Sequence, residues 1–344
     1  MARSYNSVAA VADGILRFRH ARGRAGPHVT LVGGVHGNER IGVDVLDALR
    51  RAMFHVDPWP ARGWPTITNG SVTLAYGNPA AIRVGKRGSA SHQDLNRCFT
   101  TKLLQQQDRE SLLYEERRAR ALAANTGASD VMIDVHSTNK PSLPFLRVAG
   151  HPQGVPPHVQ RFCRWLPGDI LLHDPHYLLA DGRVALTDEY VGANGGIGIC
   201  YESGLATDYT PATVEQLGNA LWDILEHELN VVEFRRPTAA DPATMGAAPP
   251  VGQRRVYEIK QVLKLTADGF EWADGVGNAN FELVPAGRPI GYVQGQAVTV
   301  NYHAYLVFPK VKSLWKVGSY VNLQLSGLSM LSLRPLVWLA QCVQ

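Results

Sequence analysis

Short apolar runs alternate with segments of helical periodicity over the first two thirds of the chain. The run HVTLVGGV at 28–35 has the length of a buried strand, and segment 39–56 behind it repeats apolar residues at helical spacing. Strands alternating with helices predict an α/β fold, a mixed and mainly parallel sheet flanked by helices. The other expected strands lie at 71–76, 130–135 and 196–201, and the other expected helices at 110–125 and 214–229.

The pattern changes after residue 235. Residues 236–252 are rich in Pro, Ala and Gly and have no periodicity, which is typical of a linker. Residues 253–344 contain short β-type runs separated by glycines. They predict a smaller C-terminal all-β domain, a barrel or sandwich. We therefore expect an α/β domain at 1–235, a linker, and a β domain at 253–344.

Composition excludes several classes of protein. The chain has 344 residues, of which 45% are hydrophobic and 19% charged, so a disordered protein is excluded. The net charge of +4 is mild, and no basic stripe with interleaved aromatic residues is present. We therefore expect no nucleic-acid partner.

Cysteine spacing and hydropathy indicate the compartment. Cys98, Cys163, Cys200 and Cys342 lie far apart without a CxxC pair, which argues against a disulfide scaffold or a thiolate metal site. No apolar stretch reaches the ~20 residues of a membrane span, and the N-terminus has no signal-peptide core. The expectation is a cytoplasmic protein without a membrane partner.

Candidate metal ligands follow two of the expected strands. His36 and Glu39 open the helix after strand 28–35, where Gly33 and Gly34 permit a sharp turn, and His136 follows strand 130–135. An HxxE pair alone is more often a helix start with an exposed histidine. Two histidines and one glutamate, however, form a known ligand set of catalytic zinc. Asp134 would face the same way as His136 and could orient its imidazole. The alternative, that Asp134 is an ordinary polar residue at the end of a strand, fits the sequence equally well.

Two further groups of polar residues accompany these ligands. Asn96 and Arg97 form a donor pair suited to a carboxylate, and Arg83, Lys86 and Arg87 precede them. Such cations can polarise a carbonyl; otherwise they form a basic surface loop. Glu202 ends the apolar strand before Ser203-Gly204, where it could act as a general base. Taken alone, a glutamate at such a position is more often an ordinary helix-cap or loop residue.

Four motifs together resemble the succinylglutamate desuccinylase/aspartoacylase family of the zinc carboxypeptidase-like group. They are GGVHGNERIG (33–42), YGNPAAIRVGKR with QDLNRCF (76–99), DVHSTN (134–139) and CYESG (200–204). They occur in the family's order, and the resemblance covers about residues 28–235. A weaker similarity to the family's C-terminal barrel runs through 282–291 and 305–311.

The resemblance implies a fold and residue roles. The fold is zinc carboxypeptidase-like, with one zinc ion per chain held by His36, Glu39 and His136. Glu202 matches the catalytic acid/base, and the pair Asn96–Arg97 matches the residues that bind the α-carboxylate. Arg87 resembles the carbonyl-polarising arginine, with Arg83 or Lys86 as alternatives because the spacing before Asp94 is longer than usual. The implied substrate is a small N-acyl amino acid, and a homo-oligomer is compatible with the resemblance.

One family feature is missing. Members that act on aspartate or glutamate derivatives carry an arginine about ten residues before the catalytic glutamate, whereas residues 185–196 contain no basic residue. Asp188 and Glu189 in that stretch are expected to repel an anionic group. The hypothesis from sequence is therefore a substrate with a neutral or cationic group there.

Two other functions share these residues. A metallocarboxypeptidase that trims short peptides uses the same ligands, but a β domain over the site would exclude long peptides. A catalytically inactive metal-binding relative is the other alternative, although ligands and base usually degrade together and all four are present.

Overall fold

A twelve-stranded sheet forms the centre of the molecule. The computed structural model describes residues 6–91, 93–108, 110–235, 253–265, 268–312 and 320–332. The strand order is β1-β2-β5-β3-β6-β9-β7-β8-β11-β17-β16-β13. The central strands are parallel: β5 (Ser71–Tyr76), β3 (His28–Gly33), β6 (Val131–Thr138) and β9 (Ile197–Leu205). The flanking strands are β1 (Ser7–Ala12), β2 (Ile15–Arg19), β7 (Phe145–Ala149) and β8 (Ile170–Asp174).

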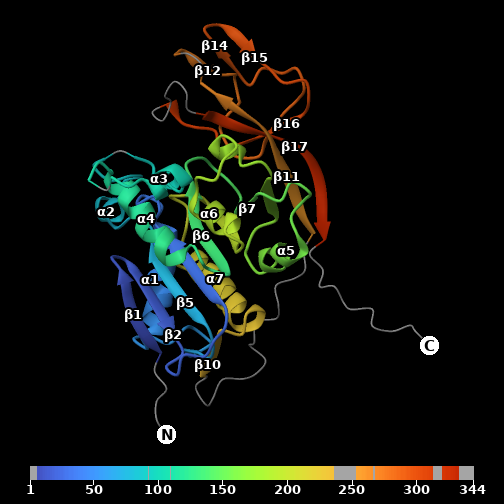
Figure 1. Cartoon of the computed structure of the whole chain (residues 1–344). Helices are drawn as coiled ribbons and strands as arrows, with labels where there is room; N and C mark the ends of the chain where they lie inside the picture. Colours follow the sequence, from blue (N-terminus) through green and yellow to red (C-terminus); the bar gives the residue numbers. More distant parts are fainter. Residues whose placement is uncertain are drawn as a thin grey trace, which may run out of the picture.

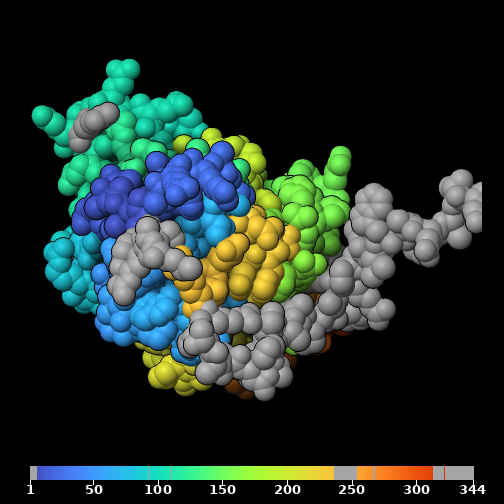
Figure 2. Space-filling view, turned by 90° about the horizontal axis from the view of Figure 1, so that it is seen from below, coloured from blue at the N-terminus to red at the C-terminus, as the bar shows by residue number. Residues whose placement is uncertain are grey.

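Helices cover both faces of this sheet (Figure 1). On one face, α1 (Arg40–Met53), α5 (Pro157–Cys163) and α7 (Pro211–Asp223) share a core with the central strands. On the other face, α4 (Tyr114–Thr126) and α6 (Thr187–Ala193) close a second core. Seen from below, the blue N-terminal segments and the yellow segment that contains α7 adjoin (Figure 2). The shorter helical elements are α2 (Pro79–Val84), η1 (Leu95–Arg97), α3 (Thr101–Gln105), η2 (Leu178–Ala180) and the π-helical η3 (Ile224–Glu228).

The C-terminal strands extend the same sheet. β11 (Gln253–Lys264) pairs in parallel with β8, and β17 (Tyr320–Ser332) pairs antiparallel with β11. Tyr257 and Ile259 of β11 pack in one apolar cluster with Phe145 and Leu172. The remaining strands are β13 (Glu282–Val284) and β16 (Ala304–Val307) in this sheet, β12 (Phe270–Trp272), β14 (Gly291–Val293) and β15 (Gln296–Val298) in a small second sheet, and the pair β4 (Trp64–Ile67) and β10 (Val232–Arg235).

The predicted fold class is confirmed, with differences at element ends. The expected strands at 130–135 and 196–201 continue to Thr138 and Leu205, because their ladder extends three residues or more beyond the apolar run. Residues 297–308, one of the β-type runs after the linker, divide between β15 and β16. The predicted linker at 236–252 and Cys342 lie outside the described residues. Among the described helices, none is long and apolar enough to cross a membrane.

The proposed division at 235/253 stays a prediction. Since β11 hydrogen-bonds to β8, the residues after the linker complete the α/β sheet and do not stand apart from it. Separate folding of the two parts is therefore not expected.

Candidate metal and catalytic site

A close helix–strand contact positions the first two ligands. A side chain at Gly33 of β3 would meet the Gly42 carbonyl of α1 at 2.4 Å, and one at Gly42 would meet the Val135 carbonyl at 2.8 Å. Only hydrogen fits at these positions, so α1 begins directly against β3 and β6. Glu39 is the residue before α1, and its carboxylate therefore reaches the end of β6.

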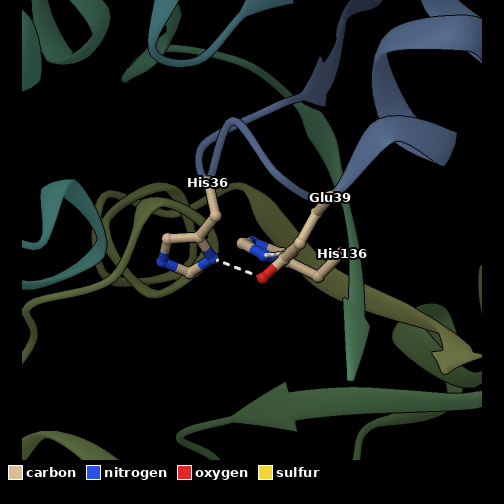
Figure 3. Close-up of side chains that lie close together, drawn as sticks. All are labelled: His36, Glu39 and His136. Carbon is tan, nitrogen blue, oxygen red and sulfur yellow. Dashed lines mark hydrogen bonds and ion pairs between the residues drawn. The ribbon is translucent and has the colours of Figure 1, made fainter. Parts of the chain in front are cut away.

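The carboxylate of Glu39 lies between two imidazoles (Figure 3). Its Oε1 is 2.8 Å from His36 Nδ1 and its Oε2 is 2.9 Å from His136 Nδ1. All three residues are buried, and one ligand atom of each lies within 4.8 Å of the others. Burial alone would raise the pKa of Glu39, but the neighbouring imidazoles hold it well below its usual range. Two imidazoles and a carboxylate converging in a buried site fit a zinc ion.

Each histidine also faces a second carboxylate. His36 Nε2 lies 3.0 Å from Asp94 Oδ1, and His136 Nε2 lies 3.1 Å from Asp134 Oδ2. Such partners fix ring orientation in metal sites. Orienting the imidazole of His136 is one of the two interpretations of Asp134 that the sequence allows. Asp94 was missed in this role, because its pairing with His36 spans 58 residues and its own motif indicated only ligand binding.

Glu202 lies beside the metal group. It is opposite His136 in the register of β6 and β9, and it is 7% exposed. Its Oε2 has no hydrogen-bond partner among the described residues. Burial raises the pKa of Glu202 to about 7, with Glu39 adding to the effect and His136 opposing it. A carboxyl group with this environment is suited to exchanging protons near neutral pH.

Asn96 and Arg97 both line the cavity into which Glu39 and Glu202 also face. The side-chain oxygen of Asn96 accepts hydrogen bonds from the backbone N–H and the hydroxyl of Thr187, at 3.1 and 3.0 Å. Because its oxygen is anchored on α6, the amide nitrogen of Asn96 is the end that can donate to a ligand. Arg97 donates to the Asn96 backbone carbonyl at 2.6 Å, which keeps its guanidinium group next to Asn96.

The three preceding cations differ in position. Arg87 lines the cavity, donates to Asp94 at 2.9 Å and lies 3.7 Å from Glu39. Lys86 also lines the cavity. Arg83 is exposed in the last turn of α2 and is not among the lining residues, whereas Lys86 and Arg87 come after Gly85 has ended that helix. The expectation that Arg83 binds substrate therefore has no support from its position.

A buried arginine changes the interpretation of the acidic stretch at 185–196. Arg147 of β7 is fully buried and donates to Asp188 at 3.0 Å and to Glu189, and it lies 3.6 Å from Asp174. Burial raises the pKa of Asp188 to about 6 although Arg147 opposes this. Asp188 and Glu189 are buried, engaged with Arg147 and not among the residues that line the cavity, so their repulsion of an anionic substrate stays a prediction. The strand FLRVA gave no sign of this pairing.

These residues line one cavity of about 1000 Å³. Its wall includes residues from both parts of the chain, since Val262, Lys264, Asn280 and Phe308 follow the linker. Basic side chains outnumber acidic ones in the lining. The basic residues are Lys86, Arg87, Arg97, Lys102, Lys140, Arg147, Arg183, Lys264 and Lys310, and the acidic ones are Glu39, Asp94, Glu116, Asp181 and Glu202.

Sequence comparisons point to one family. The succinylglutamate desuccinylase/aspartoacylase catalytic domain matches residues 25–227. A probable aspartoacylase from Nostoc sp. is 38% identical over 115 residues, which is 32% of this chain and 35% of that protein. An N-acyl-aromatic-L-amino acid amidohydrolase (carboxylate-forming) B from Danio rerio is 33% identical over 116 residues, which is 32% of this chain and 34% of that protein. The matched region thus spans about a third of these curated relatives.

Solved structures share the fold over nearly the whole chain. Succinylglutamate desuccinylase from Vibrio cholerae superposes with a TM-score of 0.66 at 15% identity, covering 95% of this chain and 94% of that one. Murine aminoacylase 3 superposes with a TM-score of 0.61 at 19% identity, covering 89% of this chain and 97% of that one. Since the catalytic-domain match covers more than half of the chain, the protein belongs to the succinylglutamate desuccinylase/aspartoacylase family.

Proposed function

We propose that this protein is a zinc-dependent hydrolase of the amide bond of a small N-acyl amino acid. The observation that carries the proposal is the buried group His36–Glu39–His136 with Glu202 opposite His136 in the adjacent strand. Curated relatives with the names aspartoacylase and N-acyl-aromatic-L-amino acid amidohydrolase support the reaction class.

His36, Glu39 and His136 would hold the zinc ion, and Asp94 and Asp134 would orient the two imidazoles. A zinc ion in such a site is a Lewis acid that polarises a carbonyl and makes water more acidic. Asn96 and Arg97 would bind the carboxylate of the amino acid through a charge-assisted donor pair. Arg87 would donate to the carbonyl oxygen as negative charge develops on it.

Glu202 performs the proton transfers in this mechanism. It removes a proton from the attacking water and then delivers it to the nitrogen of the leaving amine. Its burial suits both steps, because a carboxyl group with a pKa of about 7 can accept and release a proton near neutral pH.

The contribution of both parts of the chain to the cavity wall favours a small substrate over a peptide. The residues after the linker contribute to its wall, whereas a carboxypeptidase needs an open groove. The basic lining is compatible with an anionic acyl group or side chain, so the neutral or cationic preference expected from sequence is not part of the proposal.

The decisive experiment combines metal analysis with a hydrolysis screen. Purified protein would be assayed on N-acetyl, N-succinyl and N-formyl amino acids and on dipeptides, with and without a chelator. We expect about one zinc ion per chain and chelator-sensitive release of a free amino acid. Release from peptides alone would move the assignment to a carboxypeptidase, and inactivity after zinc addition would favour the inactive metal-binding alternative.

A further inference from the structure

The segment that follows His136 forms one side of the cavity. Ser137, Thr138, Asn139 and Lys140 all line it. Within the segment, the Thr138 hydroxyl donates to the Lys140 carbonyl at 2.7 Å. On one flank it packs against the end of β9, where a side chain at Gly204 would lie 2.9 Å from the Ser142 carbonyl. Ser137 and Thr138 are held by the bond from the Ser137 N–H to Glu39 and by pairing with β9, so the other flank, at Lys140 and Pro141, is the part that needs a further contact.

Asn280, from the part of the chain after the linker, holds that flank. Its backbone N–H donates to the Pro141 carbonyl at 2.9 Å, and its side-chain amide lies 3.3 Å from the Lys140 carbonyl and 3.4 Å from that of Pro141. Its side-chain oxygen accepts the Phe308 backbone N–H at 2.7 Å. Asn280 is 8% exposed, so these bonds are little screened by water. The buried side chain of Asn280 thus joins the cavity wall to Phe308, the residue that follows β16.

Two strained aromatic residues accompany this asparagine. Phe281 and Phe308 have positive φ angles of 60° and 52°, a conformation that costs bulky residues about 1–3 kcal/mol. Their rings lie 5.0 and 5.7 Å from that of Phe145, which is opposite Glu202 in the register of β7 and β9. The surrounding contacts must maintain this strain, and they meet at β7, which pairs with the strand that carries Glu202.

We propose that Asn280 is a positioning residue that fixes the Ser137–Pro141 wall for substrate binding. This proposal rests on the proposed function. Asn280 acts through the carbonyl groups of Lys140 and Pro141 and does not take part in the chemistry. Its loss leaves the metal ligands in place and moves the Lys140–Pro141 end of the wall, away from the Ser137 N–H that donates to Glu39.

Two substitutions separate the wall contacts from the contact with Phe308. Asn280→Asp keeps an acceptor for the Phe308 N–H and removes the side-chain donor to the wall, so that only the backbone N–H bond to Pro141 remains, whereas Asn280→Ala removes all side-chain bonds. Asn278→Ala is the matched control, because Asn278 is exposed and donates only its backbone N–H, to Glu282 at 3.2 Å.

Steady-state kinetics of folded, zinc-loaded protein provide the first test. We expect both Asn280 variants to raise KM by roughly ten- to a hundredfold, with a smaller change in kcat and unchanged zinc content. The Asn278 variant should match wild type. Wild-type KM in Asn280→Asp would overturn the proposal, since it would limit the role of Asn280 to the bond with Phe308.

Hydrogen exchange provides a second test that does not depend on turnover. The backbone amides of residues 137–140 should exchange faster in Asn280→Asp than in Asn278→Ala. If wild type hydrolyses no substrate, the proposed function fails, while faster exchange still supports the positioning role. Equal exchange in the two variants overturns the positioning role, whatever the activity.

Discussion

Both histidines of the candidate metal group have a carboxylate close to each ring nitrogen. Nδ1 of each faces Glu39, and Nε2 faces Asp94 in one case and Asp134 in the other. This leaves each ring a single orientation. Ligand geometry therefore depends on residues that would not touch a metal ion themselves.

Asp94→Asn tests this dependence. The amide removes the carboxylate that His36 and Arg87 share, so we expect zinc affinity to fall roughly ten- to a hundredfold. Competition with a chromophoric chelator measures it. Asp208→Asn, at an exposed position, is the control, and unchanged affinity in Asp94→Asn would remove Asp94 from the site.

Glu202→Gln tests the general base. Gln has the same shape but cannot accept the proton, so turnover should fall by ~10²–10⁴-fold or more while zinc content stays constant. The control is Glu233→Gln on the exposed side of β10. More than a tenth of wild-type turnover in the Glu202 variant would contradict the assignment.

Sequence motifs predicted residues that neighbouring parallel strands bring together. His36, His136 and Glu202 stand at the carboxyl ends of β3, β6 and β9, which are adjacent in the sheet. Arg147 could not be predicted, because its partners lie 27 to 42 residues away and a single arginine within an apolar strand has no characteristic pattern.

At the scale of elements, the ionic contacts of Arg147 join α6 to β7 and β8. Arg147→Met would leave Asp174, Asp188 and Glu189 buried without their cation. We expect a loss of about 3–5 kcal/mol in the free energy of unfolding, measured by urea denaturation. Arg161→Met is the control, since that side chain is 55% exposed in its ion pair with Glu228. Equal stability of both variants would contradict this prediction.

The start of β3 gives the fold a pH dependence. Burial and the nearby Arg17 lower the pKa of His28 to about 4, and its ring lies 3.0 Å from the Thr73 hydroxyl. The unfolded chain takes up this proton near pH 6.5, so protonation favours unfolding. The contribution of His28 is therefore complete above pH 6.5 and is lost as pH falls towards 4.

His28→Gln should flatten this part of the pH profile. Urea midpoints of zinc-free protein between pH 7 and 4 measure it, with His158→Gln at an exposed position as control. We expect the His28 variant to lose less stability than wild type over this range. If the pH profiles of the His28 variant and wild type run in parallel, groups other than His28 cause the loss of stability in acid.

Periodicity predicted the type of every long element in the α/β part, but it set strand ends too early at β6 and β9. The polar residues after their apolar runs still pair with neighbouring strands, as His136 does with Glu202. The apolar pattern indicates which residues are buried, whereas the length of a strand depends on the neighbouring strand with which it forms hydrogen bonds.

At the scale of the molecule, β11 covers the edge of β8. All five residues of β8 are buried, and two of them, Ile170 and Leu172, pack against the chain after the linker. A fragment ending at residue 235 should therefore expose an apolar edge strand and aggregate. Size-exclusion chromatography of the fragment and the full chain measures this. A monomeric, folded fragment would restore the division predicted from sequence.

The contact between Gly33 and Gly42 has a consequence for mutagenesis of the gene. Neither residue carries a functional group, yet any larger residue would displace Glu39 by forcing α1 away from β3. In a random library screened for activity, both codons should be as intolerant as those of the ligands themselves. A screen of that kind would record two apparent active-site residues that no inhibitor or substrate ever reaches.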